Sequence, residues 1–243
     1  MLSKVKNIFD DLKKHNIFHF GSYISGSQYL NAYKLIRKYA EPESLILDWG
    51  AGSGHFSFFL LNQGHKVDAF TIENECKLSD HLKKTYPDKY RILLHQDPLA
   101  TLPFDDQSFD IVVSIGVLEH VSDTNHDEIQ SLKQIRRVLK PNGVFICYHF
   151  PNKYSWIEAI TKYLNSKYNH NYKYTTKDIT ELNEKSKMEL LEYGRYGIMP
   201  RNSFRVIPNN LLITTIYNSF DYLLSKLLNP FCQNYYFVSR QTE

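Results

Sequence analysis

Three glycines at alternate positions follow an acidic residue at the end of an apolar run. The run ends at Asp48, and the glycines are Gly50, Gly52 and Gly54. Glycine adopts backbone conformations that other residues avoid and lets the main chain approach a ligand closely. The spacing therefore predicts a loop that binds a small ligand.

Two common nucleotide-binding loops do not fit this spacing. A dinucleotide fingerprint, G-x-G-x-x-G, requires Gly or Ala three positions after Gly52, where this chain has His55. A P-loop closes with Gly-Lys-Ser or Gly-Lys-Thr, which does not follow these glycines. The loop therefore indicates neither a dehydrogenase nor a P-loop nucleotidase.

Strands and helices must alternate around this loop, because apolar runs and helical patterns take turns along the chain. Strands are predicted over residues 44–49, 66–72, 90–96, 109–115, 143–150, 188–194 and 233–240. The clearest helix covers residues 124–140, with a cap region at Ser122 and Asp123 and an end at Pro141-Asn142-Gly143. The alternation predicts a doubly wound α/β fold with a mostly parallel seven-stranded sheet and helices on both faces.

Length and composition fit one globular domain. The chain has 243 residues, of which 42% are hydrophobic and 23% charged. We expect a single domain over 1–243, with an N-terminal helical cap over about 1–40 and a substrate-shaping insertion over about 152–175. The formal net charge of +3 is too small to indicate a nucleic-acid surface.

Cysteine usage and hydrophobic patterning favour a cytoplasmic location. The cysteines, Cys76, Cys147 and Cys232, lack disulfide or metal-ligand spacing. Apolar residues in the first 16 positions recur at helical spacing, so no export signal is expected. Polar residues interrupt the segment from Leu211 to Leu228, which excludes a membrane span. We expect an amphipathic helix that covers the sheet between its last two strands, with membrane contact as the alternative.

The glycine loop resembles the D-x-G-x-G-x-G motif of class I S-adenosylmethionine-dependent methyltransferases. Residues 93–123, LLHQDPLATLPFDDQSFDIVVSIGVLEHVSD, resemble the third and fourth strand region of that family. Residues 138–146, VLKPNGVFI, resemble its approach to strand five. The last ninety or so residues are loosely similar to the small-molecule branch, which includes quinone-biosynthesis and sugar O-methyltransferases. The resemblance implies a Rossmann-like methyltransferase fold, S-adenosylmethionine as cofactor and methyl transfer as the reaction.

The resemblance also assigns cofactor contacts near the first two strands. Gly50, Gly52 and Gly54 are expected to leave room for the methionine and ribose parts, because a Cβ there would collide with the ligand. Asp48 is expected to accept a hydrogen bond from the ammonium group, directly or through water. The family's ribose-binding acid would fall at Thr71. Because Glu73 lies two residues on and on the same strand face, we predict that Glu73 takes this role.

Further contacts are expected at the ends of the third and fourth strands. Asp97 resembles the acid that accepts from the adenine amino group, with Gln96 and Pro98 beside it. Ligands of open α/β sheets bind outside the carboxyl ends of the strands. That rule puts Ser114 and Ile115 beside the sulfonium.

The acceptor is expected to be a small molecule with a hydroxyl group, deprotonated by His149 or His170. A histidine suits this role because its ordinary pKa lies near operating pH. The tyrosines expected to line the acceptor pocket are Tyr148, Tyr172 and Tyr174. His120 is expected to be structural. No metal site is expected, because Asp105 and Asp106 form a solvated turn without a third ligand at suitable spacing.

Other reactions remain alternatives to O-methylation. The acceptor atom can be N or C in place of O. A nucleic-acid methyltransferase is disfavoured by the weak charge and by the lack of the Asn/Asp-Pro-Pro-Tyr/Phe element that grips a flipped base. A noncatalytic subunit that binds the cofactor and stabilises a partner is the third class.

Overall fold

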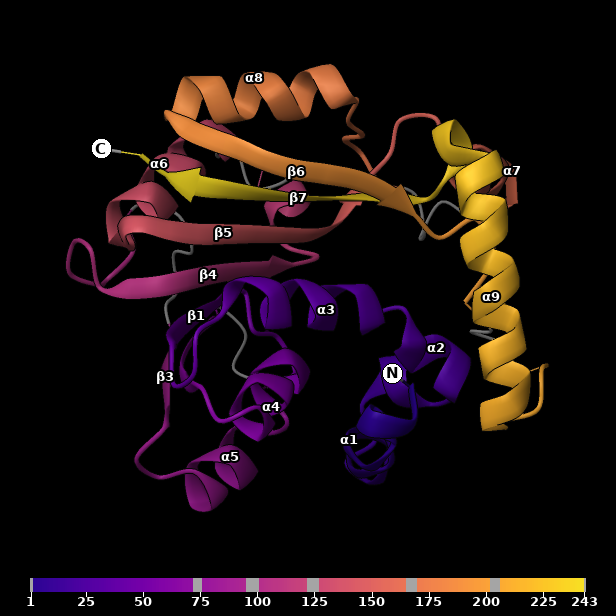
Figure 1. Ribbon diagram of the computed structural model, residues 1–243, viewed down its shortest axis with the longest axis horizontal. Helices are drawn as coiled ribbons and strands as arrows, with labels where there is room; N and C mark the ends of the chain where they lie inside the picture. The colour runs from indigo at the N-terminus through magenta and orange to yellow at the C-terminus, as the bar shows by residue number, and fades with distance from the viewer. Residues whose placement is uncertain are drawn as a thin grey trace.

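A seven-stranded sheet forms the centre of the protein. The computed structural model describes residues 2–71, 76–94, 101–121, 127–164, 170–201 and 206–242. The strands are β1 (Leu45–Trp49), β2 (Lys66–Thr71), β3 (Tyr90–Leu94), β4 (Phe109–Ile115), β5 (Leu139–Pro151), β6 (Met188–Tyr196) and β7 (Asn234–Gln241). Their order is β3-β2-β1-β4-β5-β7-β6, and only the pairs that include β7 are antiparallel (Figure 1). The predicted fold class is confirmed.

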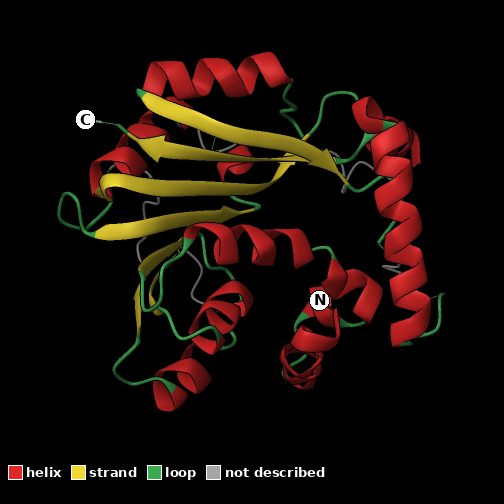
Figure 2. Cartoon of the chain, viewed as in Figure 1, coloured by secondary structure: helices red, strands yellow, loops and turns green. Residues whose placement is uncertain are grey.

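Helices cover both faces of the sheet and one of its ends (Figure 2). One face carries α3 (Leu30–Tyr39), α4 (His55–Asn62) and α5 (Ser79–Thr85). The other face carries α6 (Glu128–Val138) and α8 (Thr176–Ser186). Near the end toward which β4 and β6 run lie α1 (Leu2–Lys14), α2 (Tyr23–Ser27), α7 (Trp156–Leu164) and α9 (Leu211–Leu227) (Figure 1). Single 3₁₀ turns occur at Phe18–Phe20, Leu118–His120 and Asn229–Phe231.

The alternation of side chains along each strand produces two apolar cores. Neighbouring residues of a strand point to opposite faces of the sheet. Ile46 belongs to the core under α3 and α4, whereas Leu47 belongs to the core under α6 and α8. The pairs Val113 with Val112 and Ile146 with Phe145 divide in the same way. Both faces of the sheet are therefore buried, which explains its almost continuous apolar strands.

The strand order reverses between β1 and β4. From β1 the chain continues to β2 and β3 on one side, whereas β4 continues to β5 on the other. Trp49 and Ser114 are register partners where the two strands end. Ligands of such sheets bind in the crevice outside this reversal. The loops that follow β1 and β4 therefore flank the expected cofactor position.

The ends of helix α6 differ from the prediction of residues 124–140. The helix begins at Glu128 because the Asp127 carboxylate caps it, accepting a 2.7 Å hydrogen bond from the Ile129 backbone N–H. Ser122 and Asp123, the predicted cap region, lie outside the described residues. The helix ends at Val138 and β5 begins immediately at Leu139. The Pro141-Asn142-Gly143 turn therefore lies inside β5 and does not end the helix.

Helix α9 forms where predicted but does not cover the sheet. It stands across the end of the sheet beside α2, where Ser27 Oγ donates to Asn218 Oδ1 at 2.9 Å (Figure 1). Its polar residues Asp221 and Ser225 are buried. Its exposed stripe is apolar and consists of Leu212, Ile216, Phe220, Leu223 and Leu227. Within the described residues, every helix is too short or too polar to cross a membrane.

Candidate active site

The glycine loop is tied to the end of β2. The backbone N–H groups of Gly50 and Ala51 donate to the Phe70 carbonyl at 2.8 and 3.0 Å. Gly50, Gly52 and Gly54 have φ angles of +79°, +48° and +82°, in the left-handed region that favours glycine. The three glycines therefore serve a tight turn at the point where the strand order reverses.

Only Gly52 of the three borders open space. A Cβ on Gly50 would lie 2.3 Å from Val117 Cγ2, and one on Gly54 would lie 2.9 Å from Cys76 Sγ. A Cβ on Gly52 would meet nothing closer than the Gly50 carbonyl oxygen, 3.9 Å away. The sequence suggested that a Cβ at each glycine would collide with the ligand. At Gly50 and Gly54 this explanation must be corrected, because a Cβ there would collide with side chains of the protein itself.

Asp48 is a buried carboxylate two residues before the glycine loop. It is 1% exposed and lies one residue before the end of β1. Ser57 Oγ donates a hydrogen bond to Asp48 Oδ2 at 2.6 Å. Burial raises the pKa of Asp48 to about 6, against the opposing effect of the Ser57 hydrogen bonds. A bound ammonium group would stabilise the ionised form, so the carboxylate suits a cationic ligand.

Two functional side chains, Glu119 and His149, lie beside the carboxyl end of β4, where the predicted residues Ser114 and Ile115 are also found. Ser114 is buried, and its Oγ has no hydrogen-bond partner within the described part of the chain. Ile115 is half-buried. A Cβ on Gly116, which has φ of +72°, would lie 3.6 Å from Glu119 Oε1 and 3.8 Å from His149 Cβ. Glu119 and His149 therefore flank the end of β4.

His149 lies at an irregularity in β5. Its φ of +69° is in the left-handed region, and the register with β7 shifts between Tyr148 and Phe150. Its backbone N–H donates to Tyr196 Oη at 3.0 Å, and its Nδ1 lies 2.8 Å from the same oxygen. Its Nε2 is buried without a partner among the described residues. Burial, followed by nearby positive charges including Arg201, lowers the pKa of His149 well below its ordinary value, so the imidazole is neutral near pH 7.

Two aromatic residues that the sequence reasoning missed cover this region. The Tyr29 ring lies 4.8 Å from the His55 ring and 5.2 Å from the His149 ring, between centroids. His55 Nδ1 is 3.2 Å from Ser53 Oγ, and burial lowers its pKa to about 3. His55 follows the glycine loop directly, which was a usable signal. Tyr29 lies in no motif and is placed by the packing of the N-terminal helices.

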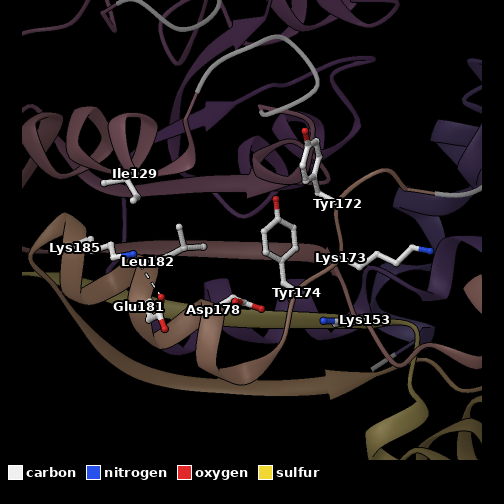
Figure 3. Close-up of a pocket in the computed structure, with 9 residues that line it drawn as sticks. All are labelled: Ile129, Lys153, Tyr172, Lys173, Tyr174, Asp178, Glu181, Leu182 and Lys185. Carbon is white, nitrogen blue, oxygen red and sulfur yellow. Dashed lines mark hydrogen bonds and ion pairs between the residues drawn. The ribbon is translucent and has the colours of Figure 1, made fainter.

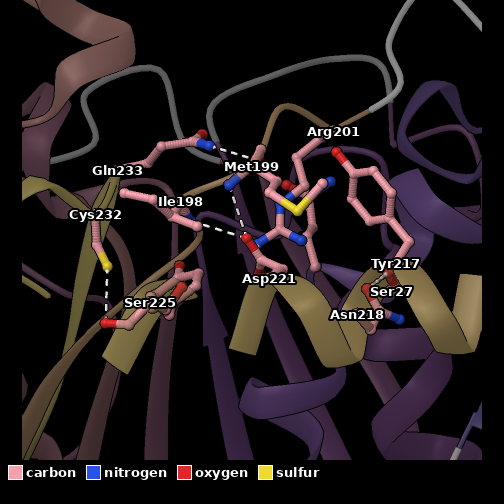
Figure 4. Close-up of polar contacts among 12 residues, drawn as sticks. Ser27, Ile198, Met199, Arg201, Tyr217, Asn218, Asp221, Ser225, Cys232 and Gln233 are labelled. Carbon is pink, nitrogen blue, oxygen red and sulfur yellow. Dashed lines mark hydrogen bonds and ion pairs between the residues drawn. The ribbon is translucent and has the colours of Figure 1, made fainter. Parts of the chain in front are cut away.

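Segment 197–201 follows β6 and is fixed by contacts with α9 (Figure 4). Asp221 Oδ1 accepts from the backbone N–H groups of Ile198 and Met199 at 2.9 and 2.7 Å. Arg201 Nη2 lies 3.5 Å from Asp221 Oδ2. The buried polar face of α9 therefore positions a positive charge near the end of the sheet.

The predicted insertion is closed at its base and carries His170. Lys153 N donates to the Tyr174 carbonyl at 2.9 Å, and Tyr174 N donates to the Pro151 carbonyl at 3.0 Å. His170 Nδ1 lies 2.7 Å from Glu158 Oε1. Although burial acts to raise it, hydrogen bonds from His170 lower the pKa of Glu158 below its ordinary value. His170 is thus held by an ionised carboxylate.

The predicted tyrosines are divided between two places. Tyr172 and Tyr174 line a pocket of about 330 Å³ between the insertion, α6 and α8 (Figure 3). That pocket includes none of the predicted cofactor residues. Tyr148 does not line an open rim as expected, because it is fully buried and its hydroxyl donates to the Gln28 carbonyl at 2.8 Å.

Four predicted cofactor contacts cannot be placed. Glu73, Gln96, Asp97 and Pro98 lie outside the described residues. Thr71, the alternative ribose ligand, is buried at the end of β2 and pairs in register with Leu94 of β3. The assignment of the ribose and adenine contacts therefore stays a prediction.

Comparison with known proteins agrees with the fold and the loop. Residues 47–147 match the family model of a methyltransferase domain. The matched region contains the glycine loop and extends from β1 into β5, and it agrees with the resemblance to class I S-adenosylmethionine-dependent methyltransferases. The raised pKa of Asp48 and the open space at Gly52 fit a cofactor that carries an ammonium group.

Relatives with different acceptors share this region. The protein named Probable tRNA methyltransferase 9B of Mus musculus is 31% identical over 120 residues, 48% of this chain and 25% of that protein. The ubiquinone/menaquinone biosynthesis C-methyltransferase UbiE of Bartonella quintana is 32% identical over 111 residues, 44% of this chain and 41% of that protein. The chain spans between a quarter and about half of the length of the curated relatives it matches.

A solved structure shares the fold over most of the chain. It is the Burkholderia thailandensis 1,6-didemethyltoxoflavin-N1-methyltransferase with bound 1,6-didemethyltoxoflavin and S-adenosylhomocysteine. It matches with a TM-score of 0.60 and 18% identity, over 89% of this chain and 79% of that one. This likeness concerns the fold.

Proposed function

We propose that the chain transfers a methyl group from S-adenosylmethionine to a hydroxyl group of a small molecule. The observation that carries this proposal is the position of two histidines near the cofactor side of the sheet. His149 flanks Gly116 at the end of β4, and His170 reaches the neighbourhood of Glu119. A hydroxyl needs a proton acceptor for methylation, and a histidine can supply one.

The cofactor is held by residues at the carboxyl ends of the strands. Asp48 binds the ammonium group, the Gly50–Gly54 loop borders the methionine and ribose, and Ser114 and Ile115 lie beside the sulfonium. Glu73 binds the ribose hydroxyls, and Asp97, with Gln96 and Pro98, binds the adenine. When bound, S-adenosylmethionine supplies an electrophilic methyl carbon, whose bond to sulfur breaks as its bond to the acceptor oxygen forms. Holding the reactants in line supplies much of the acceleration.

The hydroxyl proton goes to His149 or His170. Glu158 orients His170 through a 2.7 Å hydrogen bond, the arrangement that commonly fixes a catalytic histidine. Tyr196 orients His149, whose low pKa makes it a weak base that suits an acidic hydroxyl such as a phenol. The insertion that carries His170 also carries Tyr172 and Tyr174, which suit an aromatic acceptor.

N- or C-methylation of a small molecule is the main alternative, since one relative is named as a C-methyltransferase. A tRNA acceptor is favoured by the relatives named Probable tRNA methyltransferase 9B, from Mus musculus, Homo sapiens and Bos taurus, but the formal charge of +3 opposes it. A noncatalytic cofactor-binding subunit would bind S-adenosylmethionine without turnover. Each alternative predicts a different fate for the methyl group.

Histidine variants test the proposed acceptor chemistry. His149→Gln and His170→Gln are compared with His15→Gln, a control at an exposed histidine. Loss of the responsible base should lower kcat by about 10² to 10⁴ while the affinity for S-adenosylmethionine is retained. If both single variants and the double variant keep native turnover at neutral pH, the proposal of a base-assisted hydroxyl acceptor is wrong.

A further inference from the structure

Glu119, His120 and His170 bring three metal-binding side chains together at the end of β4. One ligand atom from each residue lies within 4.8 Å of the other two. Ligands about 2.1 Å from one ion, in adjacent positions, are about 3 Å apart from each other. The side chains therefore need to approach by less than about 2 Å to share an ion. Glu119 is buried and His120 is exposed, so the cluster faces solvent on one side.

A second contact gives His170 the geometry of a metal ligand. Its Nδ1 donates to Glu158 Oε1 at 2.7 Å, and its backbone N–H donates to Glu158 Oε2 at 3.2 Å. Lys173 Nζ holds the same Oε2 at 3.2 Å. A metal-ligating histidine almost always donates its other ring N–H to a carboxylate or carbonyl, which fixes the ring and its tautomer. With Nδ1 on Glu158, Nε2 is the nitrogen that can bind an ion.

We propose that Glu119, His120 and His170 bind one divalent transition-metal ion, which coordinates the acceptor hydroxyl. Two imidazoles and one carboxylate favour ions such as Mn²⁺, Fe²⁺ or Zn²⁺ over Mg²⁺, which prefers oxygen ligands. Three protein ligands leave open positions for an acceptor, as in catalytic metal sites. The part that concerns the acceptor rests on the function proposed above.

The position of the cluster explains what the ion would do. Glu119 Oε1 lies 3.6 Å from the place of a Cβ on Gly116, at the point where β4 ends. A hydroxyl bound to the ion at this point would be close to the methyl donor. The positive charge lowers the pKa of a bound hydroxyl, so oxygen becomes a better nucleophile. His170 then holds the ion, and His149 remains to take the proton.

Metal titration tests the site without reference to turnover. The chain is first freed of metal with a chelator, and Mn²⁺ binding is then measured by calorimetry and by the loss of the free-ion electron paramagnetic resonance signal. His120→Ala and His170→Ala remove ligands, whereas Glu158→Gln removes only the orienting carboxylate. The control is His15→Ala with His81→Ala, because these two rings lie 4.6 Å apart and neither belongs to the cluster. Melting temperature and S-adenosylmethionine affinity establish that each variant is folded.

The expected result is one Mn²⁺ per native chain, retained in the control. Glu158→Gln should weaken binding by about 10- to 100-fold, and the ligand variants should weaken it further. Absence of Mn²⁺ binding, or equal binding to native protein and His120→Ala, would overturn the proposed site. Methylation of a hydroxyl that persists in chelator would overturn the metal's role and leave the proposed function intact. Mn²⁺ binding together with transfer only to nitrogen, carbon or RNA would keep the metal site and overturn the proposed function.

Discussion

Ser57 Oγ donates to Asp48 Oδ2 at 2.6 Å, and both side chains are buried. The folded-state pKa of Asp48, about 6, lies above the ordinary value of 3.8. A raised carboxyl pKa means that the folded state holds its proton more tightly than the unfolded state. The contribution of Asp48 to stability is therefore fully present below about pH 4 and is lost as pH rises to about 6.

Asp48→Asn should separate stability from cofactor binding. At pH 7 without cofactor, the variant should be more stable than the native chain by about 3 kcal/mol, because no buried charge forms. At pH 3.5 the difference should vanish. Urea unfolding at the two pH values measures this, and calorimetry should show weaker S-adenosylmethionine binding at pH 7. A variant that binds the cofactor with native affinity would contradict the role of Asp48.

Gly52→Ala should weaken S-adenosylmethionine binding through the space that its Cβ occupies. The matched control is Gly64→Ala, because Gly64 also has a positive φ, +95°, and a Cβ there would meet no atom within 4 Å. Both variants lose about 1 kcal/mol of stability from backbone strain. Only Gly52→Ala should lower cofactor affinity in calorimetry, and equal affinities in the two variants would show that Gly52 does not border the cofactor.

The ribose contact can be assigned by comparing Glu73 with Thr71. Glu73→Ala should weaken S-adenosylmethionine binding by about 1.5 to 3 kcal/mol, through the loss of charge-assisted hydrogen bonds. Thr71→Val should cost much less. Calorimetric titration of both variants gives the order, and the reverse order would assign the ribose to Thr71.

Tyr196→Phe should disturb His149 through the loss of one oxygen atom. That oxygen accepts the His149 backbone N–H at 3.0 Å, so its removal leaves a buried donor without a partner and costs about 1 to 3 kcal/mol. Tyr193→Phe, at an exposed tyrosine of the same strand, is the control. The free energy of unfolding, measured with denaturant, and kcat should both fall for Tyr196→Phe, whereas neither should fall for the control. Native stability in that variant would exclude the proposed orientation of His149.

Features that depend on a local pattern of residues could be predicted from the sequence. Features that depend on contacts between distant segments could not. Apolar runs and the glycine motif were sufficient for the strands, the sheet and the position of Asp48. The cluster of Glu119, His120 and His170 could not be found, because some fifty residues separate His170 from the adjacent Glu119 and His120 and no spacing rule joins them. The predicted orientation of α9 was wrong. Its apolar stripe suggested a buried face, whereas the face that is buried is the polar one, from which Asp221 binds segment 197–201.

The irregular backbone at His149 was also beyond the sequence. A left-handed residue in a strand is usually glycine, and histidine adopts this conformation only where surrounding contacts hold it. Those contacts come from Tyr196 and Tyr29, which lie on β6 and immediately before α3. Packing between segments far apart in the chain therefore sets the candidate acceptor side, whereas the cofactor side follows from one short motif.

The fate of a labelled methyl group shows whether the chain methylates a hydroxyl group of a small molecule. S-adenosylmethionine labelled in its methyl group is incubated with the chain and, in separate reactions, a metabolite extract and total tRNA. We expect label in a small molecule whose mass increases by one methylene and which carries the new group as a methyl ether, with none in tRNA. Label in tRNA, or no transfer by a chain that binds the cofactor, would contradict this expectation.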